Sequence, residues 1–173
     1  MKKITEVKPF IFLYEKLEPK EIKTIISLVK KAPSQKYNNV SRTDWGITCL
    51  GEEPYFNYVW ECLKDFRKAY CDLFGMPILT VDGSSWFQIY KKNSHHDWHN
   101  HPKTNFTNVL YLKGGSCLQT ELADHQLNDI VYPGTILTFP GFMKHRSKIN
   151  TDSKEKIIIS FNTSLTDKYK TQV

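Results

Sequence analysis

The sequence lacks several features that would assign it to common functional classes. Its apolar runs are far too short to cross a bilayer, and "PFIFLY" near the N-terminus is too short for the core of a signal peptide. Only four cysteines occur in 173 residues and none forms a C-x-x-C pair, so neither a zinc ribbon nor a thioredoxin-like site is supported. These absences predict a cytoplasmic protein with no membrane segment.

Motifs of several enzyme and binding classes are missing as well. The sequence has no G-x-S-x-G nucleophile elbow and no phosphate-binding G-x-x-x-x-G-K loop. The formal net charge of +6 favours anionic partners, but the lysines are dispersed and no arginine-rich block is present. We therefore expect no specific nucleic-acid partner, and the oligomeric state is left open.

The residues that are present are those of one folded domain. Apolar residues make up 40% of the chain and charged residues 24%, which is typical of soluble globular proteins, and the length suits one core. We expect a single domain over residues 1–173. It would consist of a helical brace and connector over residues 1–76 and a strand-rich core over residues 77–173.

Two amphipathic segments predict helices in the first part of the chain. "EPKEIKTIISLVKKAP" repeats isoleucine and valine at helical spacing, and "YFNYVWECLKDFRKAYCDLFG" carries an aromatic stripe that ends before Gly75. Residues 33–54 between them are polar and are either a loop over an active site or a connector. After Pro77, short apolar runs alternate with turn residues, which predicts a mainly β sandwich or barrel such as a jelly roll.

Four of the six histidines lie within the stretch "SHHDWHNHPK". If this stretch is extended, alternation of side chains places the following residues on one face: His95, Asp97, His99 and His101. Imidazole and carboxylate groups bind divalent ions such as Fe(II), Mn(II) and Zn(II), and two histidines with one carboxylate leave coordination positions open. His145, which follows a turn further along the chain, is a candidate for an additional ligand. The pattern favours a metal site.

Three segments of the second half, between Trp86 and Asn162, carry motifs in a fixed order. They are "WHNHPKTNFTNVLYLKGG", "PGTILTFPGFMKHRSKIN" and "KEKIIISFN". This order of H-x-H-P, F-P, H and S-F-N resembles the 2-oxoglutarate- and Fe(II)-dependent oxygenases, in particular a largely uncharacterised branch from phages and bacteria. The resemblance implies a double-stranded β-helix, which is a cupin-like jelly roll. It also implies hydroxylation of a substrate that is either a protein side chain, for example prolyl, or a small molecule.

The resemblance implies His99 as the first metal ligand and His145 as the distal one. The family usually has Asp or Glu two positions after the first ligand, whereas this sequence has His101 there. The remaining ligand is then one of three candidates, in order of preference: His101, Asp97 of the His95-x-Asp97 pair, or Glu121 from a neighbouring strand.

The same resemblance implies Lys156 as the base that binds the far carboxylate of 2-oxoglutarate, with Tyr90 and Ser160 as nearby hydroxyl groups. The alternatives are an exposed lysine and a core tyrosine. Fe(II), 2-oxoglutarate and dioxygen are the cofactors expected on this basis, and ascorbate is left open as an auxiliary reductant. Two other interpretations compete with this one. They are a cupin-type metalloenzyme that does not use 2-oxoglutarate, and a jelly-roll binding module whose histidines are not catalytic.

Overall fold

The structure is a computed structural model that describes residues 4–15, 17–47, 54–76, 78–115, 118–128 and 131–166. The helices of this part of the chain are α1 (Pro19–Lys31), α2 (Pro54–Cys62) and α3 (Lys64–Phe74). Its strands are β1 (Ile4–Lys8), β2 (Ile11–Glu15), β3 (Gln35–Tyr37), β4 (Val40–Thr43), β5 (Ile78–Tyr90), β6 (His96–His99), β7 (Phe106–Lys113), β8 (Thr120–Leu122), β9 (Thr135–Pro140), β10 (His145–Ser147) and β11 (Lys156–Thr166).

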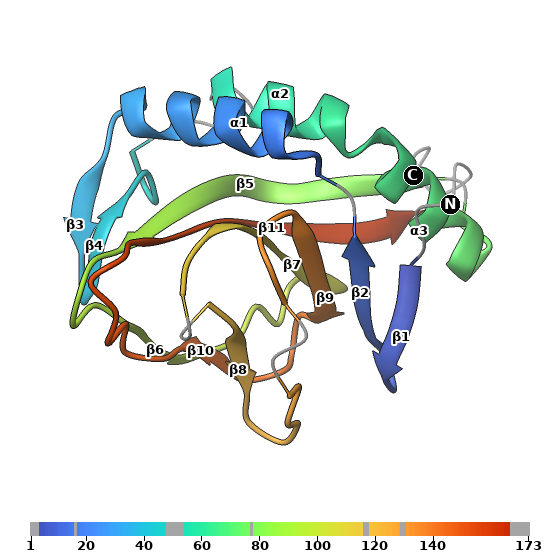
Figure 1. The fold of residues 1–173 in the computed structure, drawn as a ribbon. Helices are drawn as coiled ribbons and strands as arrows, with labels where there is room; N and C mark the ends of the chain where they lie inside the picture. Colours follow the sequence, from blue (N-terminus) through green and yellow to red (C-terminus); the bar gives the residue numbers. More distant parts are fainter. Residues whose placement is uncertain are drawn as a thin grey trace.

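The strands form two antiparallel sheets that face each other. The larger sheet has the order β1-β2-β9-β7-β11-β5-β4-β3, and the smaller has the order β6-β10-β8. The helices cover the outer face of the larger sheet, and the smaller sheet lies on its opposite side (Figure 1). Two facing antiparallel sheets are the architecture of a jelly roll. The predicted fold class, a mainly β jelly roll with flanking N-terminal helices, is therefore confirmed.

Both segments predicted to be helical are helical. At the start of α1, the Glu18 amide donates a hydrogen bond to the Glu21 carboxylate at 2.8 Å, and Pro19 occupies the first turn. The second segment is divided at Leu63 into α2 and α3, and α3 ends at Gly75, whose φ of 62° favours glycine. Among the described residues, no helix has the length and apolar character required to cross a membrane.

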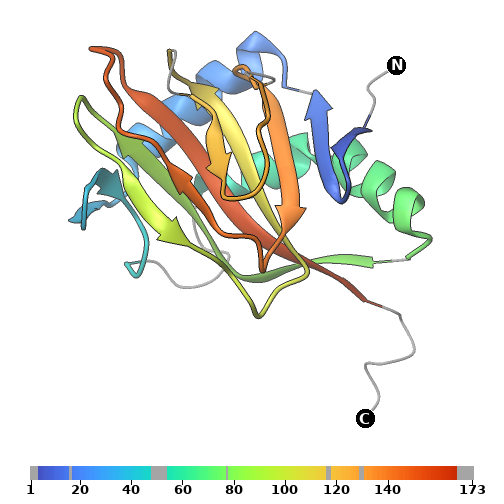
Figure 2. The same cartoon turned by 90° about the horizontal axis from the view of Figure 1, so that it is seen from below.

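The prediction of a helical brace over residues 1–76 is incomplete, because this region also contributes strands to the larger sheet. β2 pairs with β9, and β4 pairs with β5. The polar segment after α1 contains the β3–β4 hairpin, which lies beside β5 at one edge of the sheet (Figure 2). The strands β2, β3 and β4 are short and show no long alternation of apolar and polar residues in the sequence, so periodicity alone could not reveal them. Residues 48–53 of the same segment lie outside the described residues.

Side chains of the central strands alternate between two apolar cores. On β11, Ile157 and Ile159 pack toward the helices, whereas Ile158 belongs to the core between the sheets. On β5, Phe87 packs toward the helices and Tyr90 toward the smaller sheet. Burial of each such side chain contributes about 1.5–3 kcal/mol to stability. The alternation thus directs side chains such as Tyr90 of β5 and Ile158 of β11 into the space between the two sheets.

Candidate metal centre

Three histidines lie close together between the two sheets. His99, His101 and His145 each offer one ring nitrogen, and these nitrogens all lie within 4.8 Å of one another. His99 and His145 are register partners on β6 and β10, with ring centroids 4.2 Å apart. His101 lies beyond the end of β6, where its backbone N–H donates to the Gly141 carbonyl at 2.7 Å. The pairing of β6 with β10 in the smaller sheet thereby brings together His99 and His145, which are 46 positions apart in the chain.

The hydrogen bonds of these histidines leave one ring nitrogen of each available. His99 Nδ1 donates to the Asp97 carbonyl at 2.7 Å, and His145 Nδ1 donates to the Met143 carbonyl at 3.0 Å. A carbonyl oxygen only accepts, so the proton of each neutral ring is on Nδ1 and the lone pair is on Nε2. Nε2 of His101 is buried and has no hydrogen-bond partner among the described residues. Such an unpartnered buried nitrogen fits a metal ligand.

Burial keeps the three rings in the neutral form. Desolvation, together with a smaller contribution from the neighbouring His99 ring, lowers the pKa of His145 to about 3 and that of His101 to about 4. The pKa of His99 is also lowered by burial, although its bond to the Asp97 carbonyl acts in the opposite direction. Neutral imidazole is the form that binds metal ions. At neutral pH these three side chains are therefore ready to act as ligands.

The alternation expected for the histidine stretch brings His99 and His101 together but fails at His96 and Asp97, because β6 contains an irregularity. His99 pairs with His145 and His96 pairs with Ser147, so β6 has one residue more than β10 over this interval. The extra residue turns His96 toward the centre, where its ring stacks on His99 at a centroid distance of 4.0 Å. Asp97 turns to solvent instead. His96 was missed as a residue of the site, because a bulge leaves no signal in a single strand's periodicity.

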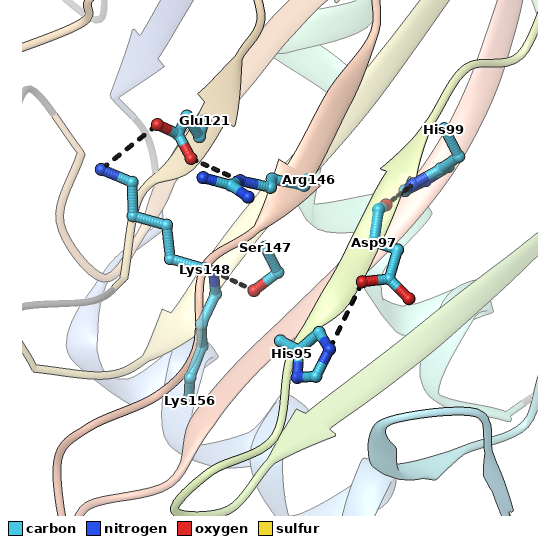
Figure 3. A network of polar contacts seen from close by, with 8 residues as sticks. All are labelled: His95, Asp97, His99, Glu121, Arg146, Ser147, Lys148 and Lys156. Carbon is cyan, nitrogen blue, oxygen red and sulfur yellow. Dashed lines mark hydrogen bonds and ion pairs between the residues drawn. The ribbon is translucent and has the colours of Figure 1, made fainter.

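The two carboxylates considered as alternative ligands lie apart from the three histidines. The Asp97 side chain is 76% exposed, and its carboxylate lies 3.3 Å from the His95 ring (Figure 3). The Glu121 carboxylate accepts a hydrogen bond from Arg146 Nε at 2.6 Å and lies 3.5 Å from Lys148 Nζ (Figure 3). The hydrogen bond from Arg146 lowers the pKa of Glu121. Neither carboxylate belongs to the group of side chains that could share one ion.

A cavity adjoins the three histidines between the sheets. Besides these histidines it is lined by Trp86, Gln88, Tyr90, His96, Thr107, Val109, Thr120, Arg146, Ser147, Ile158 and Ser160. Tyr90 and Ser160, which were predicted to bind a cosubstrate, are thus both in the lining. None of the described lining residues is acidic. The cavity therefore offers a ligand hydroxyl, amide and imidazole groups and the Arg146 guanidinium, and no negative charge from the described lining.

Lys156 lies at one side of this cavity. Its side chain is buried, with 1% of the residue exposed, and its Nζ donates to Ser147 Oγ at 2.9 Å (Figure 3). Nζ also lies 5.4 Å from the centroid of the Tyr90 ring. The register of β5 and β11, which pairs Lys156 with Tyr90, brings these groups together. An ammonium group with neighbouring hydroxyls is an arrangement that can bind a carboxylate.

The chain shares its fold with known structures at low sequence identity. Neither a family model nor a curated protein sequence matches it. An oxidoreductase of the 2OG-Fe(II) oxygenase family from Burkholderia pseudomallei superposes with a TM-score of 0.70 at 14% identity, covering 91% of this chain and 85% of the other. A prolyl-4-hydroxylase from Pseudomonas putida gives 0.66 at 13% identity, covering 91% and 93%.

A third similar structure is the viral collagen prolyl hydroxylase from Paramecium Bursaria Chlorella virus-1, in its 2OG complex. Its TM-score is 0.60 at 14% identity, and the match covers 90% of this chain and 97% of the other. The resemblance inferred from the H-x-H-P, F-P, H and S-F-N motifs is thus confirmed at the level of the fold. This chain has the jelly-roll fold of the 2-oxoglutarate- and Fe(II)-dependent oxygenases.

Proposed function

We propose that this protein is an Fe(II)- and 2-oxoglutarate-dependent dioxygenase that hydroxylates an organic substrate, and that His99, His101 and His145 hold the iron. The observation that carries the proposal is the convergence of these three neutral imidazoles inside an oxygenase-like jelly roll. Two of them keep Nε2 available through bonds to backbone carbonyls, and the third has an unpartnered buried Nε2. Such a set leaves coordination positions open for other ligands.

When bound, Fe(II) and 2-oxoglutarate supply the oxidative chemistry, in which dioxygen is consumed and succinate and CO2 are formed. The chain contributes binding and orientation. The Lys156 ammonium binds the far carboxylate as a point charge, and Ser147 shares that end of the cavity. Tyr90 is buried, which raises the pKa of its hydroxyl, so the group stays protonated and can donate to an anion. Ser160 provides a further hydroxyl in the lining.

The charge of the cavity supports a dicarboxylate as the cosubstrate. The described lining contains no acidic side chain, while Lys156 is buried beside it. A bound metal dication and the Lys156 side chain would both attract the carboxylates of such a ligand, because opposite charges interact more strongly in a partly buried site than in water. 2-Oxoglutarate carries two carboxylates, one for the metal and one for Lys156. Ascorbate and dioxygen belong to this proposal as auxiliary reductant and oxidant.

The prime substrate proposed first is a protein side chain, with prolyl as the residue to test, and a small molecule is the alternative. The support is that two of the similar structures are prolyl hydroxylases.

We propose further that residues 1–173 act as one domain, since helices and strands from both halves contribute to the same apolar core.

The three-histidine set also favours a second candidate, a cupin-type metalloenzyme that does not use 2-oxoglutarate. The side chains of His99, His101 and His145 give the metal three neutral donors and no carboxylate. That donor set differs from the two histidines and one carboxylate of the oxygenase triad. The buried Lys156 beside the cavity distinguishes the two candidates, because only the oxygenase requires it to bind a cosubstrate.

The test is an anaerobic titration of the purified protein with Fe(II), with and without 2-oxoglutarate, followed by visible absorption. A metal-to-ligand charge-transfer band that requires both components supports the oxygenase. Iron binding without the band supports the cupin-type enzyme. Absence of iron binding contradicts both and leaves a jelly-roll binding module. His125→Ala is the matched control, because His125 lies outside the group of three histidines.

A further inference from the structure

We infer that Trp45 determines which prime substrate the cavity accepts, and that it selects an uncharged apolar group, such as a saturated ring, over a charged one. The inference deepens the proposed function and rests on it, because it concerns the group that is presented to the three histidines. Trp45 belongs to the polar segment over residues 33–54, for which the sequence predicts either a loop over an active site or a connector.

Strand pairing brings Trp45 to the rim of the cavity. On β4 and β5, Thr43 lies opposite Gln88, and the same register continued by two residues puts position 45 opposite position 86. The indole rings of Trp45 and Trp86 lie edge to face, with centroids 4.6 Å apart. Trp86 is 4% exposed, lines the cavity and has its ring centroid 5.6 Å from that of His101. Trp45 is 38% exposed, so the two rings form one aromatic surface from His101 to the solvent.

Trp45 is fixed in position although it is exposed. Its backbone N–H donates to Thr43 Oγ1 at 3.1 Å, and its carbonyl accepts a hydrogen bond from Gln35 Nε2 at 2.8 Å. The preceding residue, Asp44, is buried, and its carboxylate accepts a hydrogen bond from the Phe87 amide at 2.9 Å. An exposed aromatic ring on a fixed backbone suits a binding surface, because little conformational entropy is lost when a ligand packs against it.

The charges around the two rings favour a neutral ligand. A cation could stack on an indole ring, but the described lining has no acidic residue to compensate for its charge. An anion is disfavoured on the negative face of an aromatic ring. Among the cationic side chains, Arg146 is paired with Glu121, and Lys156 is assigned to the cosubstrate. An apolar group gains free energy from burial against Trp45 and Trp86 without requiring a charged partner.

The experiment uses the full chain loaded anaerobically with Fe(II) and saturated with 2-oxoglutarate, after the binding of both has been measured. The probes are three blocked pentapeptides of alanine that differ only at the central residue, which is proline, lysine or glutamate. Isothermal titration measures their affinity for the wild type, Trp45→Ala and Trp45→Phe. Phe10→Ala is the matched control, because Phe10 is an exposed aromatic residue between β1 and β2, at the opposite edge of the larger sheet.

We expect the wild type to bind the proline peptide at least about tenfold more tightly than the other two, and Trp45→Ala to lose about tenfold in affinity for it. Trp45→Phe keeps an aromatic ring and should lose much less, and Phe10→Ala should resemble the wild type. Should Trp45→Ala fail to fold, Trp45→Gln takes its place with the same expected loss.

Two kinds of failure are distinguishable. Equal affinity of the wild type for the three peptides, binding of none of them, or unchanged affinity for the proline peptide in Trp45→Ala overturns the inference and leaves the proposed function intact. Failure of Fe(II) or 2-oxoglutarate to bind the wild type overturns the proposed function and the inference with it.

Discussion

His99 and His145 are register partners on neighbouring antiparallel strands, and each donates its Nδ1 proton to the backbone carbonyl two residues before it. The two rings are thus oriented by the same kind of local hydrogen bond, one on β6 and one on β10. The strand pairing then brings their centroids to 4.2 Å. Ligands oriented through backbone atoms do not depend on other side chains for their direction, so the centre is preorganised before any metal binds.

Replacement of a single histidine of the centre is expected to abolish tight metal binding. In His145→Ala the metal loses one of three protein ligands. We expect the affinity for Fe(II) to fall by at least about 100-fold, since even the loss of a supporting group costs 10–100-fold. Equilibrium dialysis under anaerobic conditions measures this affinity. His125→Ala serves as the control, and a His145→Ala protein that binds iron like this control would contradict the assignment.

Lys156 is expected to control the affinity for 2-oxoglutarate without controlling that for iron. A charge-assisted hydrogen bond is worth about 1.5–3 kcal/mol, so Lys156→Ala should weaken 2-oxoglutarate binding by about 10- to 150-fold. Lys156→Arg keeps the charge and should lose much less. The measurement is isothermal titration of the metal-loaded protein, with the exposed Lys154→Ala as the control. Unchanged affinity in Lys156→Ala would show that another group binds the cosubstrate.

Gly141 is expected to be required for the position of His101. A Cβ atom at residue 141 would lie 2.5 Å from the His101 carbonyl and 2.6 Å from the Thr104 carbonyl, and neither backbone atom can move freely. Gly141→Ala should therefore displace His101 and weaken metal binding, in addition to lowering the melting temperature. Gly75→Ala is the matched control, because its strain lies at the end of α3, away from the histidines. Equal metal affinity in the Gly141→Ala and Gly75→Ala variants would contradict this prediction.

The stability of the metal-free protein is expected to fall in mild acid. The pKa of His101 is lowered to about 4 and that of His145 to about 3, whereas an unfolded histidine titrates near 6.5. Below pH 6.5 the unfolded chain therefore binds more protons than the folded protein, and these groups lower the free energy of unfolding until about pH 4 for His101 and about pH 3 for His145. Above pH 6.5 these groups add no pH dependence.

Urea unfolding at pH 7 and at pH 5 measures this effect. Each of the two histidines contributes a slope of up to about 1.4 kcal/mol per pH unit within that window. His145→Asn removes one titrating group, so its unfolding free energy should depend less steeply on pH than that of the wild type. An equal or steeper dependence in the variant would show that His145 is not held in the neutral form by the fold.

Much of the site was predictable because strand alternation is a local property of the chain. Ile158 and Ser160 of β11, and Trp86 and Tyr90 of β5, line the cavity as the two-residue period predicts. The resemblance to the oxygenases also implied His99 and His145 as ligands with His101 as the preferred third, and the structure brings these three together. What failed was the same rule applied to β6, where one extra residue turned His96 inward and Asp97 outward.

The remaining features depend on which strands become neighbours, and no periodicity within a strand contains that information. The position of the Glu121 carboxylate follows from its register with Arg146 across β8 and β10. This register gives the carboxylate a cationic partner outside the group of three histidines. The N-terminal strands β1 and β2 were missed because they are short and are held by pairing, β1 with β2 and β2 with β9, rather than by their own pattern.

The sequence by itself determined the ligand types, the order of the motifs and the faces of the long strands, because residue chemistry and backbone alternation act over a few positions. Only the tertiary structure decided that His99 faces His145, that Lys156 lies beside Tyr90, and that neither Asp97 nor Glu121 joins the centre. Those relationships arise from strand register and from a bulge, which are set by packing between segments far apart in the chain.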